Sequence, residues 1–87
     1  MAISRNSGNL VETAIDAETV VMELSRGEFF SMEGTSAAIW ALIDGTRDRA
    51  ALLDELAGQF DVEAADIAGD VDRFLADLAS AGLILIG

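Results

Sequence analysis

Residues 27–45 read GEFFSMEGTSAAIWALIDG, and this stretch decides the fold. Its first part predicts a strand over Glu28–Met32, in which Phe30 and Met32 share one face because side chains alternate along a strand. After a glycine turn, an apolar run predicts a helix from residue 34 or 35 to Ile43, where an Asp-Gly pair ends it. This helix is apolar on nearly all sides, which is typical of a buried helix.

Two more strands are predicted before this stretch. Residues 10–15 and 19–24 are both compatible with short strands, and turn residues separate them from each other and from Glu28–Met32. Three strands at this spacing form an antiparallel meander, whose apolar face needs a layer of helices to cover it. Residues 1–8 are small and polar, so we predict a flexible N-terminus there and a single domain over residues 9–87.

Two more helices are predicted after it. Asp48 is a candidate N-cap, and the apolar stripe that follows it predicts a one-sided helix that reaches Phe60. After a short corner, a third helix is predicted over residues 64–81, with Gly82 as its C-cap. The order of elements therefore predicts an α+β fold of the winged helix-turn-helix type, with a three-stranded antiparallel N-terminal sheet followed by three helices.

Composition excludes several classes of function. The 87 residues include sixteen Asp and Glu against five Arg, for a net charge of −11, and they contain no Cys, His or Lys. These absences remove disulfides, thiolate and imidazole catalysis, Schiff bases and the usual zinc sites, so we expect neither enzyme activity, nor a cofactor, nor a metal. A field this acidic repels phosphate, which argues against nucleic acid and against anionic membranes as partners. With no targeting or membrane-spanning segment in the sequence, we expect a cytoplasmic protein.

Residues 27–45 resemble the PqqD family, in which an aromatic pair and a turn precede a helix that carries Ile-Trp and ends at Asp-Gly. The resemblance extends over residues 10–86. Its second half rests on Phe60-Asp61-Val62, Asp70-Val71, Phe74-Leu75, Leu78 and Gly82-Leu83-Ile84. Members of this family are RiPP recognition elements: they bind the leader segments of ribosomally synthesised, post-translationally modified peptides and are not enzymes. The resemblance thus implies a peptide-binding protein without catalytic residues.

The sequence departs from the family pattern in two places. The usual Leu-Asn before the first helix is Met32-Glu33 here, and the Pro-rich basic N-terminal segment of the coenzyme PQQ member is absent. The second departure argues against the PQQ pathway and favours the lasso-peptide type or another peptide-modification cluster. The resemblance then implies two partners, which are a precursor peptide and a processing enzyme such as a leader peptidase or cyclase. We expect a monomer or a weak homodimer.

The resemblance also places the site. In the family, the leader adds as a strand beside the third strand and lies against the third helix. The edges of a meander carry unpaired backbone groups, and an Ala-rich flank of the third helix leaves room for bulky side chains. Val71 and Leu75 on this flank have an equally simple interpretation as core residues. The predicted peptide-binding residues are Glu28, Phe29, Phe30, Ser31, Met32, Ala64, Ala68, Val71, Asp72, Leu75 and Ala79.

Two alternatives remain, which are a winged-helix transcriptional regulator and another acidic protein-interaction module. In a regulator, the third helix would enter the major groove of DNA. That helix carries four Asp residues between residues 66 and 77 against the single Arg73, so it would bring negative charge toward phosphates. The sequence therefore favours peptide recognition over regulation.

Overall fold

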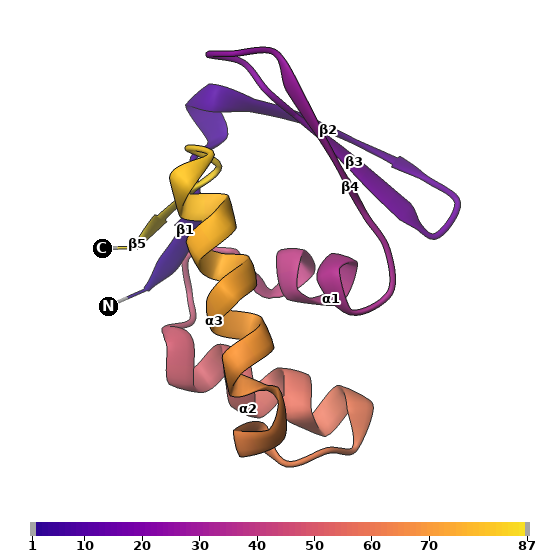
Figure 1. Ribbon diagram of the computed structural model, residues 1–87, viewed down its shortest axis with the longest axis vertical. Coiled ribbons are helices and arrows are strands. Elements are labelled where there is room, and N and C mark those ends of the chain that lie inside the picture. Colours follow the sequence, from indigo (N-terminus) through magenta and orange to yellow (C-terminus); the bar gives the residue numbers. More distant parts are fainter. Residues whose placement is uncertain (1, 87) are drawn as a thin grey trace.

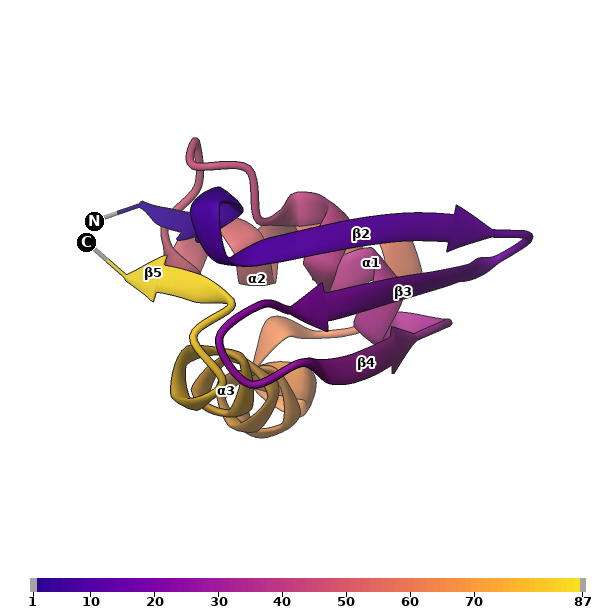
Figure 2. The same ribbon diagram turned by 90° about the horizontal axis from the view of Figure 1, so that it is seen from above.

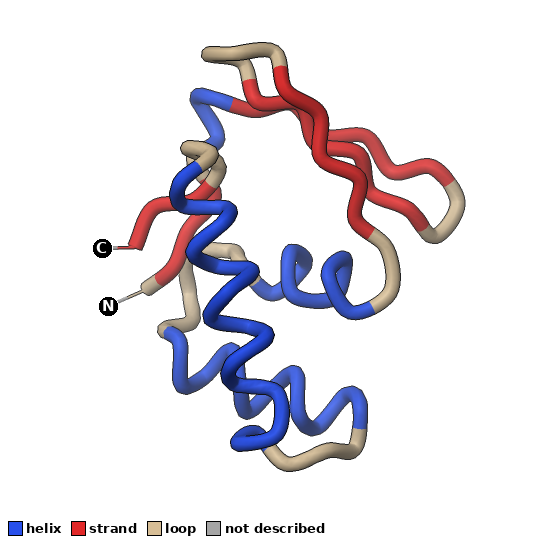
Figure 3. The backbone as a smooth tube through the Cα atoms, in the orientation of Figure 1, coloured by secondary structure: helices blue, strands red, loops and turns tan. Residues whose placement is uncertain are grey.

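The computed structural model describes residues 2–86, which form a three-stranded sheet, three helices and a small two-stranded sheet that involves both ends of the chain (Figures 1 and 3). The elements in order are β1 (Ile3–Arg5), a 3-10 turn (Ser7–Asn9), β2 (Leu10–Ile15), β3 (Glu18–Glu23), β4 (Glu28–Met32), α1 (Thr35–Leu42), α2 (Arg49–Phe60), α3 (Ala64–Ser80) and β5 (Ile84–Ile86). The predicted α+β class, with a three-stranded sheet followed by three helices, is confirmed.

The larger sheet has the order β2-β3-β4, and both pairs of strands are antiparallel. The predicted strands at residues 10–15 and 28–32 have the predicted bounds, and the middle strand starts and ends one residue earlier than residues 19–24. A two-residue turn joins β2 to β3, with Asp16 in the left-handed region at φ 55°. Because β3 lies in the centre, β4 is an edge strand, and it is the strand of this sheet on the α3 side (Figure 2).

Helix ends follow local chemistry. Asp48 caps α2 as predicted, since its Oδ1 accepts a hydrogen bond of 2.9 Å from the Ala51 amide. The helix ends at Phe60, and the next residue, Asp61, caps it with left-handed backbone geometry. α3 is followed by Gly82 at φ 77°, a conformation that glycine adopts without strain.

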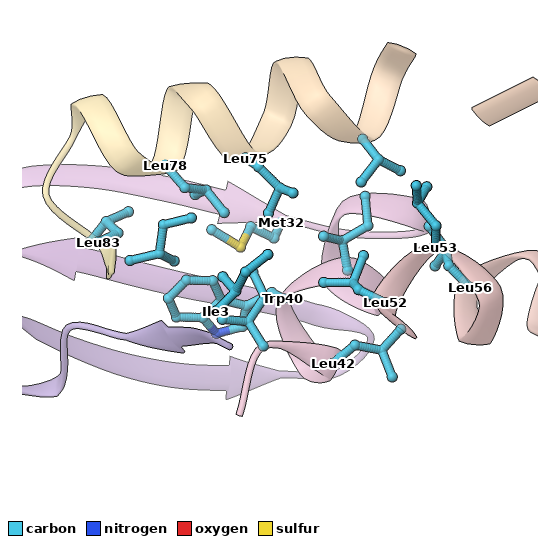
Figure 4. Close-up of a cluster of buried hydrophobic side chains, with 14 of the residues drawn as sticks. Ile3, Met32, Trp40, Leu42, Leu52, Leu53, Leu56, Leu75, Leu78 and Leu83 are labelled. Carbon is cyan, nitrogen blue, oxygen red and sulfur yellow. The ribbon is translucent and has the colours of Figure 1, made fainter. Parts of the chain in front are cut away.

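The core lies between the three helices, the inner face of the three-stranded sheet and the small sheet. Leu75 and Leu78 point from α3 toward Met32 of β4 and Trp40 of α1 (Figure 4), and all four side chains are buried. Burial of large apolar side chains is the main favourable term in folding, so this contact holds the sheet to the helices.

The N-terminus differs from the prediction. Residues 3–5 form β1, which pairs antiparallel with β5, and the Ile3 side chain is only 2% exposed. The Arg5 guanidinium lies 4.6 Å from the centre of the Trp40 ring, and its Nη1 is 2.6 Å from Glu12 Oε1. The prediction of a flexible segment over residues 1–8 is therefore wrong for this strand, because its pairing partner lies eighty residues along the chain. Met1 is outside the described residues.

No helix within residues 2–86 is long and apolar enough to cross a membrane.

The position of Ile3 yields a stability prediction. We expect Ile3→Ala to lower the free energy of unfolding by about 2–4 kcal/mol, because the side chain is buried and leaves a cavity. Leu85→Ala is the matched control in the same two-stranded sheet, where the side chain is 53% exposed, and it should change stability by less than about 0.5 kcal/mol. Urea denaturation of both variants tests this, and equal small effects would show that β1 does not contribute to the core.

Candidate functional site

The open edge of β4 is the first feature of the site. In an antiparallel pair, alternate residues direct both backbone groups toward the partner strand. The tight β2–β3 turn and the bond from the Leu24 amide to the Asn9 carbonyl fix this alternation through the register of the sheet. Glu28, Phe30 and Met32 therefore bond to β3. The N–H and C=O groups of the two residues between them, Phe29 and Ser31, point away from the sheet.

The side chains of β4 alternate as predicted. Met32 is buried, Phe30 is half-buried against the core, and Phe29 is 70% exposed on the outer face of the sheet. Phe29 lies in register with Met22 of β3, which in turn faces Val11 of β2. The edge strand thus offers free backbone groups together with an apolar row on the solvent side.

α3 lies beside this edge, but not with the flank that the sequence analysis selected. Asp72, Leu75 and Ala76 of α3 line a hollow of about 490 Å³ together with Ile3 of β1 and Ile86 of β5. In Figure 2, β4 lies to the right of α3, whereas β5 lies above it and to its left. The Ala-rich flank therefore faces the small sheet.

Helical geometry then identifies the flank of α3 on the other side of its buried stripe. Successive helix residues are 100° apart, so the positions opposite Asp72 and Ala76 are Ile67, Asp70, Phe74 and Asp77. Ile67 and Phe74 are half-buried against the core, and both aspartates are exposed. This flank alternates apolar and acidic side chains.

The predicted site residues consequently divide into two sets. The five β4 residues, Glu28, Phe29, Phe30, Ser31 and Met32, form the edge as predicted. The predicted α3 residues do not meet that edge as one surface: Val71 and Leu75 are buried in the core, Ala64 and Ala68 are half-buried, and Asp72 and Ala79 are exposed. A peptide contact with the Ala-rich flank of α3 therefore stays a prediction.

Asp72 has a different partner. Arg49 at the start of α2 holds it with two bonds, from Nε to Oδ1 at 2.6 Å and from Nη2 to Oδ2 at 2.8 Å. These bonds and the positive charge keep the pKa of the Asp72 carboxyl below its ordinary value. Asp72 therefore joins α2 to α3 across the hollow, away from β4.

Sequence analysis missed two groups of residues near the edge. Ile67 and Phe74, together with Asp70 and Asp77, are not among the predicted site residues, and no motif in the sequence singles them out. The second omission is Glu23, a buried carboxylate at the end of β3 that is 1% exposed. A glutamate beside a turn gives no indication in the sequence that its side chain points inward.

Glu23 is stabilised as a carboxylate. Burial alone would raise its pKa, but hydrogen bonds from the Arg26 and Ser25 amides and from the Asn9 side chain outweigh burial and hold the pKa below its ordinary value. The ionised side chain fixes the turn that leads into β4.

Within residues 2–86, no group of three or more acidic side chains is arranged to hold a metal ion.

The fold and the comparisons define the class of protein. The fold is a winged-helix-like α+β domain with the open edge strand β4. Residues 18–84 match the sequence pattern of the family described as coenzyme PQQ synthesis protein D (PqqD). The chain belongs to the PqqD family. No curated protein sequence matches it.

Two solved structures are similar over nearly the whole chain. TbiB1 in complex with the TbiA(β) leader peptide is 26% identical, with a TM-score of 0.81, and the match covers 97% of this chain and 94% of that one. A lasso peptide synthetase B1 complexed with its leader peptide is 19% identical, with a TM-score of 0.82 and coverage of 98% and 99%. The second likeness supports the fold alone.

The low pKa of Glu23 predicts a pH dependence of stability. Because the folded-state pKa is lowered, the carboxylate stabilises the fold above the ordinary carboxyl pKa of about 4.3, and this contribution is lost as the pH falls through the folded-state value. Glu23→Gln should therefore be less stable than the parent at pH 7, with a difference that narrows below about pH 4. Thermal melting between pH 7 and pH 3 measures it, and a constant difference over this range would contradict the assignment.

Proposed function

We propose that this protein binds the leader segment of a ribosomally synthesised precursor peptide, which adds as a strand to the free edge of β4. The observation that carries the proposal is the outward-facing backbone of Phe29 and Ser31. Unpaired backbone groups on an edge strand bind an extended peptide, and pockets for alternate side chains then select its sequence.

The comparisons support leader binding as the function. TbiB1 is solved with a leader peptide, and it shares this fold at 26% identity over 97% of the chain. Membership of the PqqD family also supports peptide binding, and the matched residues 18–84 include β3, β4 and all three helices. We infer a leader of the lasso-peptide type.

Charge supports a basic leader. Glu28 at the start of β4 and Asp70 and Asp77 on the adjoining flank of α3 are all exposed, and the whole chain has a net charge of −11. Lys and Arg side chains beside β4 would gain from this field, and an acidic segment would be repelled. Phe74 lies between the two aspartates and provides an apolar contact for an intervening leader residue.

Binding serves to present the peptide to a separate enzyme, such as a leader peptidase or cyclase. Holding one end of a substrate raises the effective concentration of its other end at a partner's active site. On this proposal the chain contributes affinity and position, and the bond-making or bond-breaking chemistry belongs to the partner.

Amide hydrogen exchange tests strand addition residue by residue. We expect a bound leader to slow exchange at Phe29 and Ser31, whose N–H groups face outward, with little change at Phe30 and Met32, which already bond to β3. The probe is a synthetic peptide with the leader sequence of the precursor encoded beside this gene. Protection confined to β2, at the other edge of the sheet, would show that the peptide binds elsewhere.

A pair of truncations separates contact residues from core residues. Phe29→Ala should leave stability within about 0.5 kcal/mol of the parent, because the side chain is 70% exposed, and weaken leader binding about five- to thirtyfold. Leu75→Ala, at 4% exposure, should instead lower the free energy of unfolding by about 2–5 kcal/mol, as should the core control Leu56→Ala.

Calorimetric titration and thermal melting on the same samples measure both effects. A folded Phe29→Ala variant that binds the leader as tightly as the parent would exclude the outer face of β4 from the interface.

A further inference from the structure

Three segments that are distant in sequence meet at the C-terminal end of α3. The Asn9 side chain, just before β2, donates from Nδ2 to Glu23 Oε1 at 2.9 Å and to the Gly82 carbonyl at 3.2 Å. Its Oδ1 accepts a bond of 2.7 Å from Ser25 Oγ in the turn between β3 and β4. One amide group therefore links the beginning of β2, the β3–β4 turn and the residue that ends α3.

Glu23 completes the link from the other side. Its Oε1 also accepts from the Ser25 amide at 2.6 Å, and its Oε2 accepts from the Arg26 amide at 2.9 Å. The carboxylate is almost fully removed from water, and a buried charge is tolerated when hydrogen bonds surround it in this way. We call Asn9 and Glu23, with the groups that they bind, the polar clasp.

The clasp lies between the two elements that flank the proposed peptide site. β4 begins at Glu28, two residues after Arg26, and α3 ends at Ser80, two residues before Gly82. Among the described residues, hydrogen bonds join β4 to β3 but not to α3. At this end of the site, the clasp is therefore the polar connection between strand and helix.

An added strand needs a gap of defined width. Neighbouring strands lie about 4.8 Å apart, so a peptide that pairs with β4 occupies the space immediately beside it. Phe30 on β4 and Phe74 on α3 are both half-buried, and apolar contact between such side chains favours closing that space. Bonds of fixed length at the clasp oppose this closure and keep the edge open before the peptide arrives, which lowers the ordering cost of binding.

From this geometry we infer that Asn9 and Glu23 are positioning residues, which set the spacing between β4 and α3 for the added peptide without touching it. The inference rests on the proposed function and extends it. It assigns a role in recognition to a buried polar group outside the edge itself.

The test compares two asparagines. Asn9→Ala breaks the clasp, and Asn6→Ala is its matched control, because Asn6 Nδ2 donates to the same Gly82 carbonyl at 3.0 Å without bonding to the β3–β4 turn. Both variants should lose some stability. Only Asn9→Ala should weaken binding of the synthetic leader peptide, by about tenfold, while Asn6→Ala should stay within about twofold of the parent.

A second variant keeps the size of the side chain. Asn9→Asp places a carboxylate oxygen against the Glu23 carboxylate and the Gly82 carbonyl, so it should bind the leader as weakly as Asn9→Ala. A folded Asn9→Asp variant with the affinity of the parent would overturn the role of the clasp. Amide exchange at Ser25 and Arg26 in the peptide-free variants reports directly whether the turn has loosened.

The outcomes separate the two proposals. If the parent binds the leader and Asn9→Ala binds equally well, or if both asparagine variants weaken binding equally, the clasp does not position the site, and strand addition stands. If the folded parent does not bind the leader at all, the proposed function fails and the role of the clasp fails with it.

Discussion

The packing of one helix stripe on the sheet is the contact on which the rest of this small domain depends. Val71, Leu75 and Leu78 of α3 are buried together with Met32 and Trp40, so strand, first helix and last helix share one core. Because this stripe occupies the centre of α3, the two flanks of the helix remain for other contacts. One of them, with Asp72 bonded to Arg49, borders the hollow beneath the small sheet.

An open strand edge exposes a protein to pairing with unwanted chains. In this protein the net negative charge opposes such pairing between two copies. Phe29 and the free backbone groups of β4 form a surface on which any extended chain could add. Two copies of the protein each have a net charge of −11 and repel one another, whereas a basic peptide is attracted. If the proposed function holds, the acidic composition therefore acts on both sides, because it attracts a basic leader and opposes pairing between two copies of the chain.

Polar side chains, as well as apolar ones, hold the ends of the elements in place. Arg5 joins β1 to Glu12 and Trp40, while Glu23 and Asn9 tie the β3–β4 turn to the end of α3. Bonds of this kind have narrow geometric tolerances, whereas apolar contacts allow sliding. In a domain of 87 residues with a limited core, they define positions that packing alone leaves loose.

Local patterns in the sequence determined much of this architecture. The strands Leu10–Ile15 and Glu28–Met32, the cap at Asp48 and the opposite faces of Phe29 and Phe30 were all predicted, because alternation and capping depend on neighbours within a few residues. β1 and β5 were not, since each three-residue strand exists only through pairing between the two ends of the chain. The sequence predicted an Ala-rich flank of α3, but the spacing of residues along a helix does not show which neighbouring element that flank faces in the folded protein. Only the tertiary packing, which sets the rotation of the helix about its buried stripe, decided that Asp72, Leu75 and Ala76 line the hollow beside the small sheet, with Ile67, Asp70, Phe74 and Asp77 on the other side of that stripe.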